Sequence, residues 1–347
     1  MSRVLVVTSA PPLTEGGHLV IARALVAALR ESGHTADIVT TPSNRFGRQG
    51  PAYLANWLTD VGMTGAGERV DQIITLRYPS YAVRHPQHVC WLNHTMREYY
   101  DRWDTWADRL SPQGRVKELV RRTLIRTADS YFLKQHVRRL FAQSEAVRAR
   151  LKRWNHVEAE VLHPPPPQRP YRCDGYGDYL FFVSRLTPLK RADLVLNALA
   201  EPAARGVRVI IGGDGEDRVR LEKLARELQV TSRVTFAGAL SETDLVDHLA
   251  RCRAVVFPPA DEDYGFVTSE AFAAGKAVVT CTDSGGPLDL VRHEQTGLIV
   301  PPTGAAMADA FARLTESTSL AEQLGAAALA TTTSMTWPAA VKKLLIS

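Results

Sequence analysis

Two cations stand close together after an apolar stretch in the second half of the chain. Residues 179–184 predict a strand, and Arg185 follows at once, with Lys190 shortly behind it. Pro188 between them is typical of the first turn of a helix, here expected to run through Leu199. A strand that turns into a helix at this point holds both cations beside the positive end of that helix. Arg185 and Lys190 are therefore candidate ligands of a diphosphate.

Two carboxylates follow a second apolar stretch. Residues 255–257 predict a short strand that two prolines end, and the acidic loop behind it carries Glu262. Glu270 lies within the apolar segment 266–274, which predicts a helix. A carboxylate inside an apolar helix costs free energy unless it has partners. Open α/β sheets bind ligands at the carboxyl ends of their strands, so Glu262 and Glu270 are expected near such an edge.

Glycines separate the elements of this stretch. Gly265 leads into the predicted helix, and Gly275 lies where that helix would end in the left-handed conformation. Residues 277–281 predict another buried strand, and Gly285-Gly286 predict a tight turn into the next helix. Strands and helices alternate here as they do in a parallel α/β sheet.

The amino-terminal part of the chain begins with the same kind of unit. The apolar run 4–7 predicts a strand buried on both faces, Gly16-Gly17 precede a helix over 19–31, and 36–40 predict the next strand. These glycines either let backbone N–H groups approach a phosphate or form a plain tight turn. They do not make a G-x-G-x-x-G, so a dinucleotide fingerprint is absent. Further strands are predicted at 71–76, 88–92, 207–211 and 234–237.

These features together resemble glycosyltransferase family 4, retaining enzymes of the GT-B fold. Seven residues separate Glu262 from Glu270, and their setting resembles the family's Glu-x7-Glu signature, although Asp263-Tyr264 stands where Gly-Phe is usual. The resemblance implies an α/β protein with two Rossmann-like domains facing across a cleft. It also implies a hexosyltransferase-type enzyme. Such an enzyme moves a sugar from a nucleotide diphosphate to an acceptor hydroxyl and retains the anomeric configuration.

The resemblance assigns roles to single residues. Glu262 would contact hydroxyls of the donor sugar, and Glu270 would contact the ribose. Arg185 and Lys190 would neutralise the charge that grows on the leaving diphosphate. The other donor-binding residues that it implies are Gly16, Gly17, Gly213, Leu240, Ser241, Gly265, Phe266, Gly285 and Gly286.

The segment 93–106 is dense in aromatic and polar residues. It resembles the His-Thr-Pro-Met-Arg segment of some family members, although the proline is missing. On that resemblance His94 is a catalytic residue near the centre of sugar transfer, and Arg97 lies on the acceptor side. The alternative is a capped helix start with a histidine whose hydrogen bonds are satisfied within the fold.

Length and a proline run predict the domain organisation. The chain has 347 residues, which suits two domains of ordinary size. Prolines 164–167 predict a stiff connector that cannot pair in a sheet. We therefore expect an acceptor-side domain over 1–163 and a donor domain over 168–330. The tail 333–347 is expected to pack back on the first domain, as it does in the family.

Charge composition bears on the partners. The net charge of +5 suits anionic partners such as nucleotide diphosphates or acidic lipid head groups, and is too small to indicate nucleic acid. The segment 115–153 is unusually basic, which indicates the solvated face of two helices or a contact with anionic lipid. The expected partners are a UDP- or GDP-linked sugar donor and an acceptor that is a glycan, a lipid-linked saccharide or a small molecule.

The sequence gives no indication of a metal site, a disulfide framework or a membrane-spanning segment. Arg185, Lys190 and helix N-termini already supply the positive charge that a metal would bring, so neither a metal nor a cofactor is expected. The four cysteines have no paired spacing, which fits a reducing compartment. No apolar run is long enough to span a bilayer, and no signal peptide opens the chain. A cytoplasmic protein is expected, with peripheral contact at the inner face of the membrane as one option.

Two other functions fit parts of this pattern. A sugar-nucleotide epimerase of the same fold would change or release the donor sugar without any acceptor. A sugar-nucleotide-binding module without activity would lack at least one of the four charged site residues. All four are present, namely Arg185, Lys190, Glu262 and Glu270. Sugar transfer is therefore the preferred interpretation.

Overall fold

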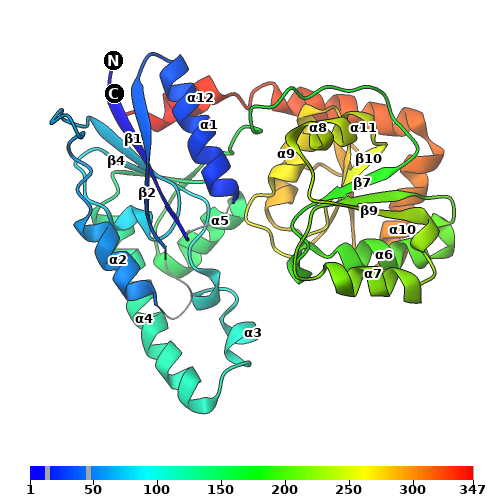
Figure 1. Ribbon diagram of the computed structural model, residues 1–347, viewed down its shortest axis with the longest axis horizontal. Helices are drawn as coiled ribbons and strands as arrows, with labels where there is room; N and C mark the ends of the chain where they lie inside the picture. The colour runs from blue at the N-terminus through cyan, green and yellow to red at the C-terminus, as the bar shows by residue number, and fades with distance from the viewer. Residues whose placement is uncertain (12–15, 44–47, 347) are drawn as a thin grey trace. The chain divides into compact units, whose positions relative to one another are not determined.

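The computed structural model describes residues 1–11, 16–43 and 48–346 of the chain (Figure 1). The chain divides into two compact units. Unit 1 comprises Met1–Pro164 and Thr336–Ser347, and unit 2 comprises Pro165–Met335. The first passage between the units falls within the proline run 164–167, and the second falls just before the last helix.

Unit 1 is built on a parallel sheet. In the described part of the chain this sheet has six strands, in the order β2-β1-β3-β4-β5-β6. They are β1 (Arg3–Ala10), β2 (Thr35–Pro42), β3 (Gln72–Thr75), β4 (His88–Leu92), β5 (Arg139–Ala142) and β6 (Glu160–Val161). β3 and β4 are buried along their whole length, as expected for strands covered on both faces. The four predicted strands of this region are confirmed, and β1 and β2 are longer than predicted.

Helices cover the sheet of unit 1. They are α1 (Gly17–Glu31), α2 (Gln49–Leu58), α3 (Trp103–Ala107), α4 (Pro112–Gln135), α5 (Glu145–Arg150) and α12 (Trp337–Leu344), with short helical turns at Ser80–Ala82, Arg97–Tyr99 and Leu151–Asn155. The Ser144 hydroxyl caps α5 by accepting a hydrogen bond from the Val147 N–H. Figure 1 shows α12 beside α1. The Trp337 ring meets Trp91 edge to face at 6.3 Å, and the Gln72 side chain donates to the Leu344 carbonyl over 2.7 Å.

Unit 2 contains a second parallel sheet. Among the described residues its six strands lie in the order β12-β11-β10-β7-β8-β9. They are β7 (Leu180–Val183), β8 (Val209–Gly212), β9 (Val234–Gly238), β10 (Ala254–Val256), β11 (Val278–Cys281) and β12 (Gly297–Val300). The predicted strands of this half are confirmed, and β12 was not predicted. The α/β fold with two Rossmann-like units is therefore confirmed.

The helices of unit 2 pack around its sheet. They are α6 (Ala192–Ala200), α7 (Arg218–Glu227), α8 (Glu242–Arg251), α9 (Phe266–Ala273), α10 (Gly304–Glu316) and α11 (Thr318–Thr332), with short helical turns at Pro188–Lys190, Pro202–Ala204, Thr231–Arg233 and Gly286–Asp289. Gly275, just after α9, has a φ of +65°, so the predicted left-handed position is confirmed.

One predicted helix is wrong. The sequence predicts a single helix from Pro188 through Leu199, but the structure has a short turn at Pro188–Lys190 and then α6. Arg191 separates them in the left-handed conformation, with a φ of +52°. A side chain with a Cβ adopts this conformation only when its surroundings hold it there.

Candidate functional site

The carboxyl edge of the unit 2 sheet gathers the predicted donor residues. All strands of the sheet run parallel, so the loops that follow β7, β8, β10 and β11 leave the sheet at the same edge. Arg185 follows β7 and Gly213 follows β8, while Glu262 and Gly285 follow β10 and β11. This edge is where open α/β sheets bind ligands.

Lys190 and Glu262 form an ion pair at this edge. The Lys190 ammonium group also lies over the Phe257 ring, 5.5 Å from its centre. Both side chains are largely buried, with 16% and 21% of their surface exposed. The structure thus joins a cation and a carboxylate that were predicted separately for the diphosphate and the sugar. A ligand that needs either group must separate the pair or bind both members of it.

Arg191 anchors the loop that carries Glu262 through hydrogen bonds. Its guanidinium group donates to the carbonyls of Pro258 and Pro259 over 2.6 and 2.8 Å, and to both Asp283 oxygens over 2.8 and 2.7 Å. The hydrogen bond and charge of Arg191 lower the pKa of Asp283. Arg191 was not predicted as a site residue, because nothing in the sequence marks the left-handed conformation that turns its side chain toward the loop.

Gly285 and Gly286 pack against the same loop. The Glu262 N–H donates to the Ser284 carbonyl over 2.9 Å, and the Gly286 N–H donates to the Glu262 carbonyl over 2.8 Å. Gly285 has a φ of +72°, and a Cβ there would lie 2.5 Å from the Glu262 carbonyl oxygen. Both glycines therefore allow a close backbone approach. In the structure the Gly286 N–H holds the Glu262 loop, whereas the sequence analysis expected it to face a donor.

Glu270 lies in the middle of α9 and is buried. It forms an ion pair with Arg169, and the Tyr171 hydroxyl donates to it over 3.3 Å. Burial raises the pKa of Glu270, and the charge of Arg169 opposes that effect. Arg169 also forms an ion pair with Glu242 at the start of α8. The partners that a buried carboxylate requires are thus two residues that the sequence analysis did not identify.

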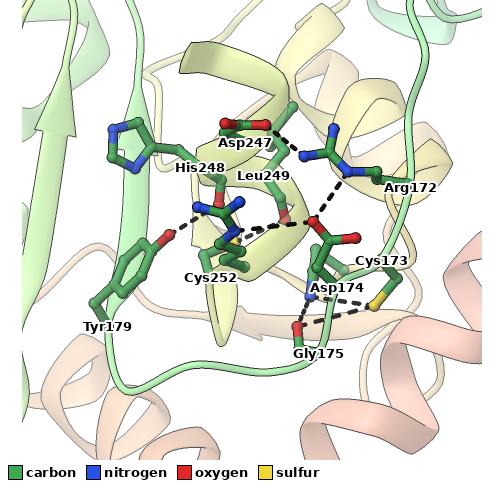
Figure 2. Close-up of polar contacts among 11 residues, drawn as sticks. Arg172, Cys173, Asp174, Gly175, Tyr179, Asp247, His248, Leu249 and Cys252 are labelled. Carbon is green, nitrogen blue, oxygen red and sulfur yellow. Dashed lines mark hydrogen bonds and ion pairs between the residues drawn. The ribbon is translucent and has the colours of Figure 1, made fainter. Parts of the chain in front are cut away.

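The segment after Arg169 and Tyr171 is held against α8 by polar contacts (Figure 2). Arg172 forms ion pairs with Asp247 and with Asp174. The Tyr179 hydroxyl donates to the His248 carbonyl over 3.2 Å. These contacts fix the course of the chain between the proline run and β7, and so they position Arg169 and Tyr171 at Glu270.

The remaining donor residues of unit 2 lie at loop and helix starts. Gly213 has a φ of +109°, and a Cβ there would lie 1.9 Å from the Ser184 carbonyl oxygen. The Ser241 hydroxyl caps α8 by accepting from the Asp244 N–H over 3.1 Å, and Leu240 packs against Gly212. Arg185 is exposed directly after β7.

Gly265 and Phe266 begin α9. Gly265 has a φ of +81°, and a Cβ there would lie 2.6 Å from the Phe257 ring. The Phe266 ring meets the Tyr264 ring edge to face at 5.2 Å. Tyr264 is buried, so an aromatic ring is kept at the position where Phe is usual, with a hydroxyl added.

The other predicted residues lie in unit 1. Gly16 precedes α1 and Gly17 is its first residue, so Gly17 belongs to the helix and not to a loop before it. The His94 ring is 2.8 Å from the Thr95 carbonyl through Nδ1 and lines a small hollow that Arg150 shares. Arg97 is buried and forms an ion pair with Asp101.

The described residues contain neither a candidate metal centre nor a helix suited to crossing a membrane. Within residues 1–11, 16–43 and 48–346, no three His, Cys, Asp or Glu side chains are placed to share a metal ion. In the same described ranges, none of the helices combines the length and the apolar character that crossing a membrane requires.

Solved structures share this fold over nearly the whole chain. Sucrose-phosphate synthase from Thermosynechococcus elongatus aligns with a TM-score of 0.77 at 18% identity, over 99% of this chain and 97% of that chain. Anabaena Alr3699/HepE in complex with UDP and glucose aligns with a TM-score of 0.73 at 17% identity, over 99% and 98%. The protein has the GT-B fold.

A family model matches within the second unit, and the relatives that follow match about half of the chain. Residues 172–331 match the family described as glycosyl transferases group 1. D-inositol 3-phosphate glycosyltransferase from Frankia alni is 32% identical over 206 residues, which are 55% of this chain and 50% of that protein. Its namesake from Corynebacterium diphtheriae is 33% identical over 185 residues, 50% and 43% of the two chains. The matched part thus spans about half the length of these relatives. These findings support a glycosyltransferase with the GT-B fold.

Proposed function

We propose that this protein is a retaining glycosyltransferase of family 4. It transfers a sugar from a nucleotide diphosphate sugar to an acceptor hydroxyl, with unit 2 as the donor domain and unit 1 on the acceptor side. The observation that carries the proposal is the ion pair of Lys190 and Glu262 at the carboxyl edge of the unit 2 sheet. Its two members have the charges that a diphosphate and sugar hydroxyls require.

Donor binding would exchange the partners of this pair. The diphosphate takes the Lys190 ammonium group, and the Glu262 carboxylate is then free to accept hydrogen bonds from the sugar. During transfer, the bond between the anomeric carbon and the diphosphate oxygen breaks, and its electron pair stays on the diphosphate. Arg185 and Lys190 meet that added charge, so they stabilise the transition state more than the bound donor. The acceptor oxygen forms a bond to the anomeric carbon, and the proton of the acceptor hydroxyl goes to the released diphosphate or to solvent.

Glu270 would bind the ribose. Its carboxylate already has Arg169 and Tyr171 as partners, which lowers the cost of burying its charge. A ribose hydroxyl donates to the remaining acceptor capacity of the carboxylate. Arg169 keeps Glu242 as a second partner, so it stays in place when Glu270 turns toward the nucleotide.

The donor is expected to be UDP- or GDP-linked. The Anabaena protein, whose structure contains UDP and glucose, favours the uridine nucleotide. We further propose that catalysis needs no metal, because Arg185 and Lys190 supply positive charge at the diphosphate. The acceptor is a glycan, a lipid-linked saccharide or a small molecule.

A thermal-shift screen followed by an activity assay tests the proposal. The protein is first heated with UDP-, GDP-, ADP- and dTDP-linked sugars, where a ligand at about a hundred times its Kd adds roughly 2.7 kcal/mol of stability. Nucleotide diphosphate release is then measured with and without acceptors, and the anomeric configuration of the product is read by NMR. Acceptor-dependent release with retention supports the proposal. A donor sugar that changes without any acceptor identifies an epimerase instead, and binding without turnover identifies a binding module.

A further inference from the structure

Helix α4 exposes an apolar stripe and buries two acidic residues. A helix on the surface of a protein normally buries an apolar stripe and exposes charged residues. α4 instead buries two carboxylates, Glu118 and Asp129. Ile125 and Leu133 are buried on the same side. Other large apolar side chains of α4 face outward, and those of Val116, Val120, Leu124 and Tyr131 are 65%, 57%, 65% and 56% exposed. Val116, Val120 and Leu124 are spaced by four residues, so they form one continuous stripe.

The buried carboxylates fix this orientation. Asp129 accepts hydrogen bonds from the hydroxyls of three tyrosines, Tyr53, Tyr81 and Tyr100. Glu118 accepts from the Tyr99 hydroxyl over 2.7 Å. Turning the helix to bury the stripe would leave these groups without partners, which costs more than the apolar contact returns.

The cations on the inner face are engaged as well. Arg122 lies over the Trp103 ring at 4.8 Å, and Arg126 lies over the Trp154 ring at 4.8 Å. Both residues are half-buried, so the expectation that the basic segment is a solvated face is wrong for them.

Among the described residues of α4, the exposed face carries cations and no carboxylate. Lys117 and Lys134 are exposed, whereas both acidic residues of the helix point inward. Figure 1 shows α3 and the amino-terminal half of α4 extending beyond the sheet of unit 1. An apolar stripe flanked by lysines fits the boundary between the head groups and acyl chains of an anionic bilayer. A second copy of the same face would bring like charges together, so charge complementarity favours lipid.

We propose that the exposed face of α4 docks the protein on an anionic membrane surface. The stripe enters the head-group boundary, and Lys117 and Lys134 contact lipid phosphates. This inference does not depend on sugar transfer, because vesicle binding is measured without a donor or an acceptor.

Vesicle co-sedimentation of the full chain tests it. Vesicles of phosphatidylcholine alone are compared with vesicles that also contain phosphatidylglycerol, at low and high salt. We expect binding to the anionic vesicles only, weakened by salt. Leu124→Glu should bind at least about tenfold more weakly, because one buried leucine accounts for that factor or more. The matched control is Val219→Glu, which adds the same charge at an exposed valine of unit 2 and should bind like the wild type.

A second variant and a second measurement complete the test. Lys117→Glu combined with Lys134→Glu keeps the stripe and should lose the preference for anionic vesicles, and thermal unfolding establishes that each variant is folded. The proposal is overturned if the wild-type protein binds neither kind of vesicle. It is also overturned if folded Leu124→Glu binds anionic vesicles as strongly as the wild type. Light scattering tests whether a second copy of the chain binds this face of α4 instead of lipid. A wild-type dimer that Leu124→Glu dissociates, with no vesicle binding, would make the stripe a contact between two copies and would likewise overturn the proposal.

Discussion

Lys190 and Glu262 neutralise each other in the structure, so a donor must separate them before either can act on the diphosphate or the sugar. Glu270 differs from Glu262, because its partners Arg169 and Tyr171 both contact the same carboxylate oxygen, Oε1. The two carboxylates therefore serve different parts of the donor. Their substitution should affect different kinetic quantities.

We expect Glu270→Ala to weaken the binding of nucleotide diphosphate and Glu262→Ala chiefly to lower turnover. Glu270 is proposed to bind the ribose, which is present in the free nucleotide, whereas Glu262 is proposed to bind the sugar, which is not. Calorimetry with the free nucleotide separates them. Arg169 keeps its ion pair with Glu242 in the Glu270 variant, so the variant should stay folded. Equal losses of nucleotide affinity in both variants would contradict this assignment.

At the scale of elements, most of the strands could be predicted, because apolar runs and proline or glycine breaks specify them locally, but β12 was not predicted. The site was only partly predictable. The break at Arg191 depends on the carbonyls and the carboxylate that its guanidinium meets, all distant in sequence. Arg169 and Tyr171 lie just after a proline run, where no periodicity marks a functional residue. The orientation of α4, which buries Asp129 and exposes an apolar stripe, depends on tyrosines from other segments.

The turn at Gly285 gives a prediction at this scale. Gly285→Ala should lower the free energy of unfolding of unit 2 by about 2 kcal/mol or more, because the new Cβ meets the Glu262 carbonyl at a positive φ. Urea unfolding measures this. Gly206→Ala is the matched control, since a Cβ at Gly206 meets no atom within 4 Å. If both variants unfold at the same urea concentration, the close packing of Gly285 on Glu262 does not contribute to the free energy of unfolding, and the prediction is wrong.

At the scale of the whole molecule, each unit has its own sheet and its own apolar core. Unit 1 also has a buried acid at its centre. Burial raises the pKa of Asp129 to about 6, although three tyrosine hydroxyls donate to the carboxylate and oppose the shift. Stability that depends on this group therefore belongs to unit 1 and can be measured through pH.

We expect Asp129 to make unit 1 less stable as pH rises. Its pKa is higher in the folded state than the roughly 3.9 of an unfolded aspartate, so the folded state holds the proton more tightly. The contribution is complete below about pH 4 and is lost as pH rises through about 6, for a total of up to about 3 kcal/mol. Asp129→Asn should remove this part of the slope, and exposed Asp309→Asn should not. An unchanged pH profile in Asp129→Asn would contradict the shift.

Activity of the whole protein should survive chelation. Arg185 and Lys190 are proposed to supply the positive charge at the diphosphate, so EDTA should leave the rate of sugar transfer unchanged within error. Steady-state rates with EDTA, and with Mg²⁺ or Mn²⁺ added back, measure this. A rate that collapses with EDTA and returns with either metal would rule out the metal-free proposal.

The most direct test of the proposed function is the steady-state kinetics of Lys190→Ala. If Lys190 meets charge on the leaving diphosphate, its loss should lower kcat/KM by a factor on the order of 10² to 10³. Arg185→Ala should lose a similar factor, and the double variant should fall short of additivity because both cations act on one group. Arg185→Lys should also be impaired, since a point charge does not reproduce the planar guanidinium fork. Lys223→Ala, an exposed lysine on α7, should match the wild type. Folded Lys190→Ala with near wild-type kcat/KM would contradict the account.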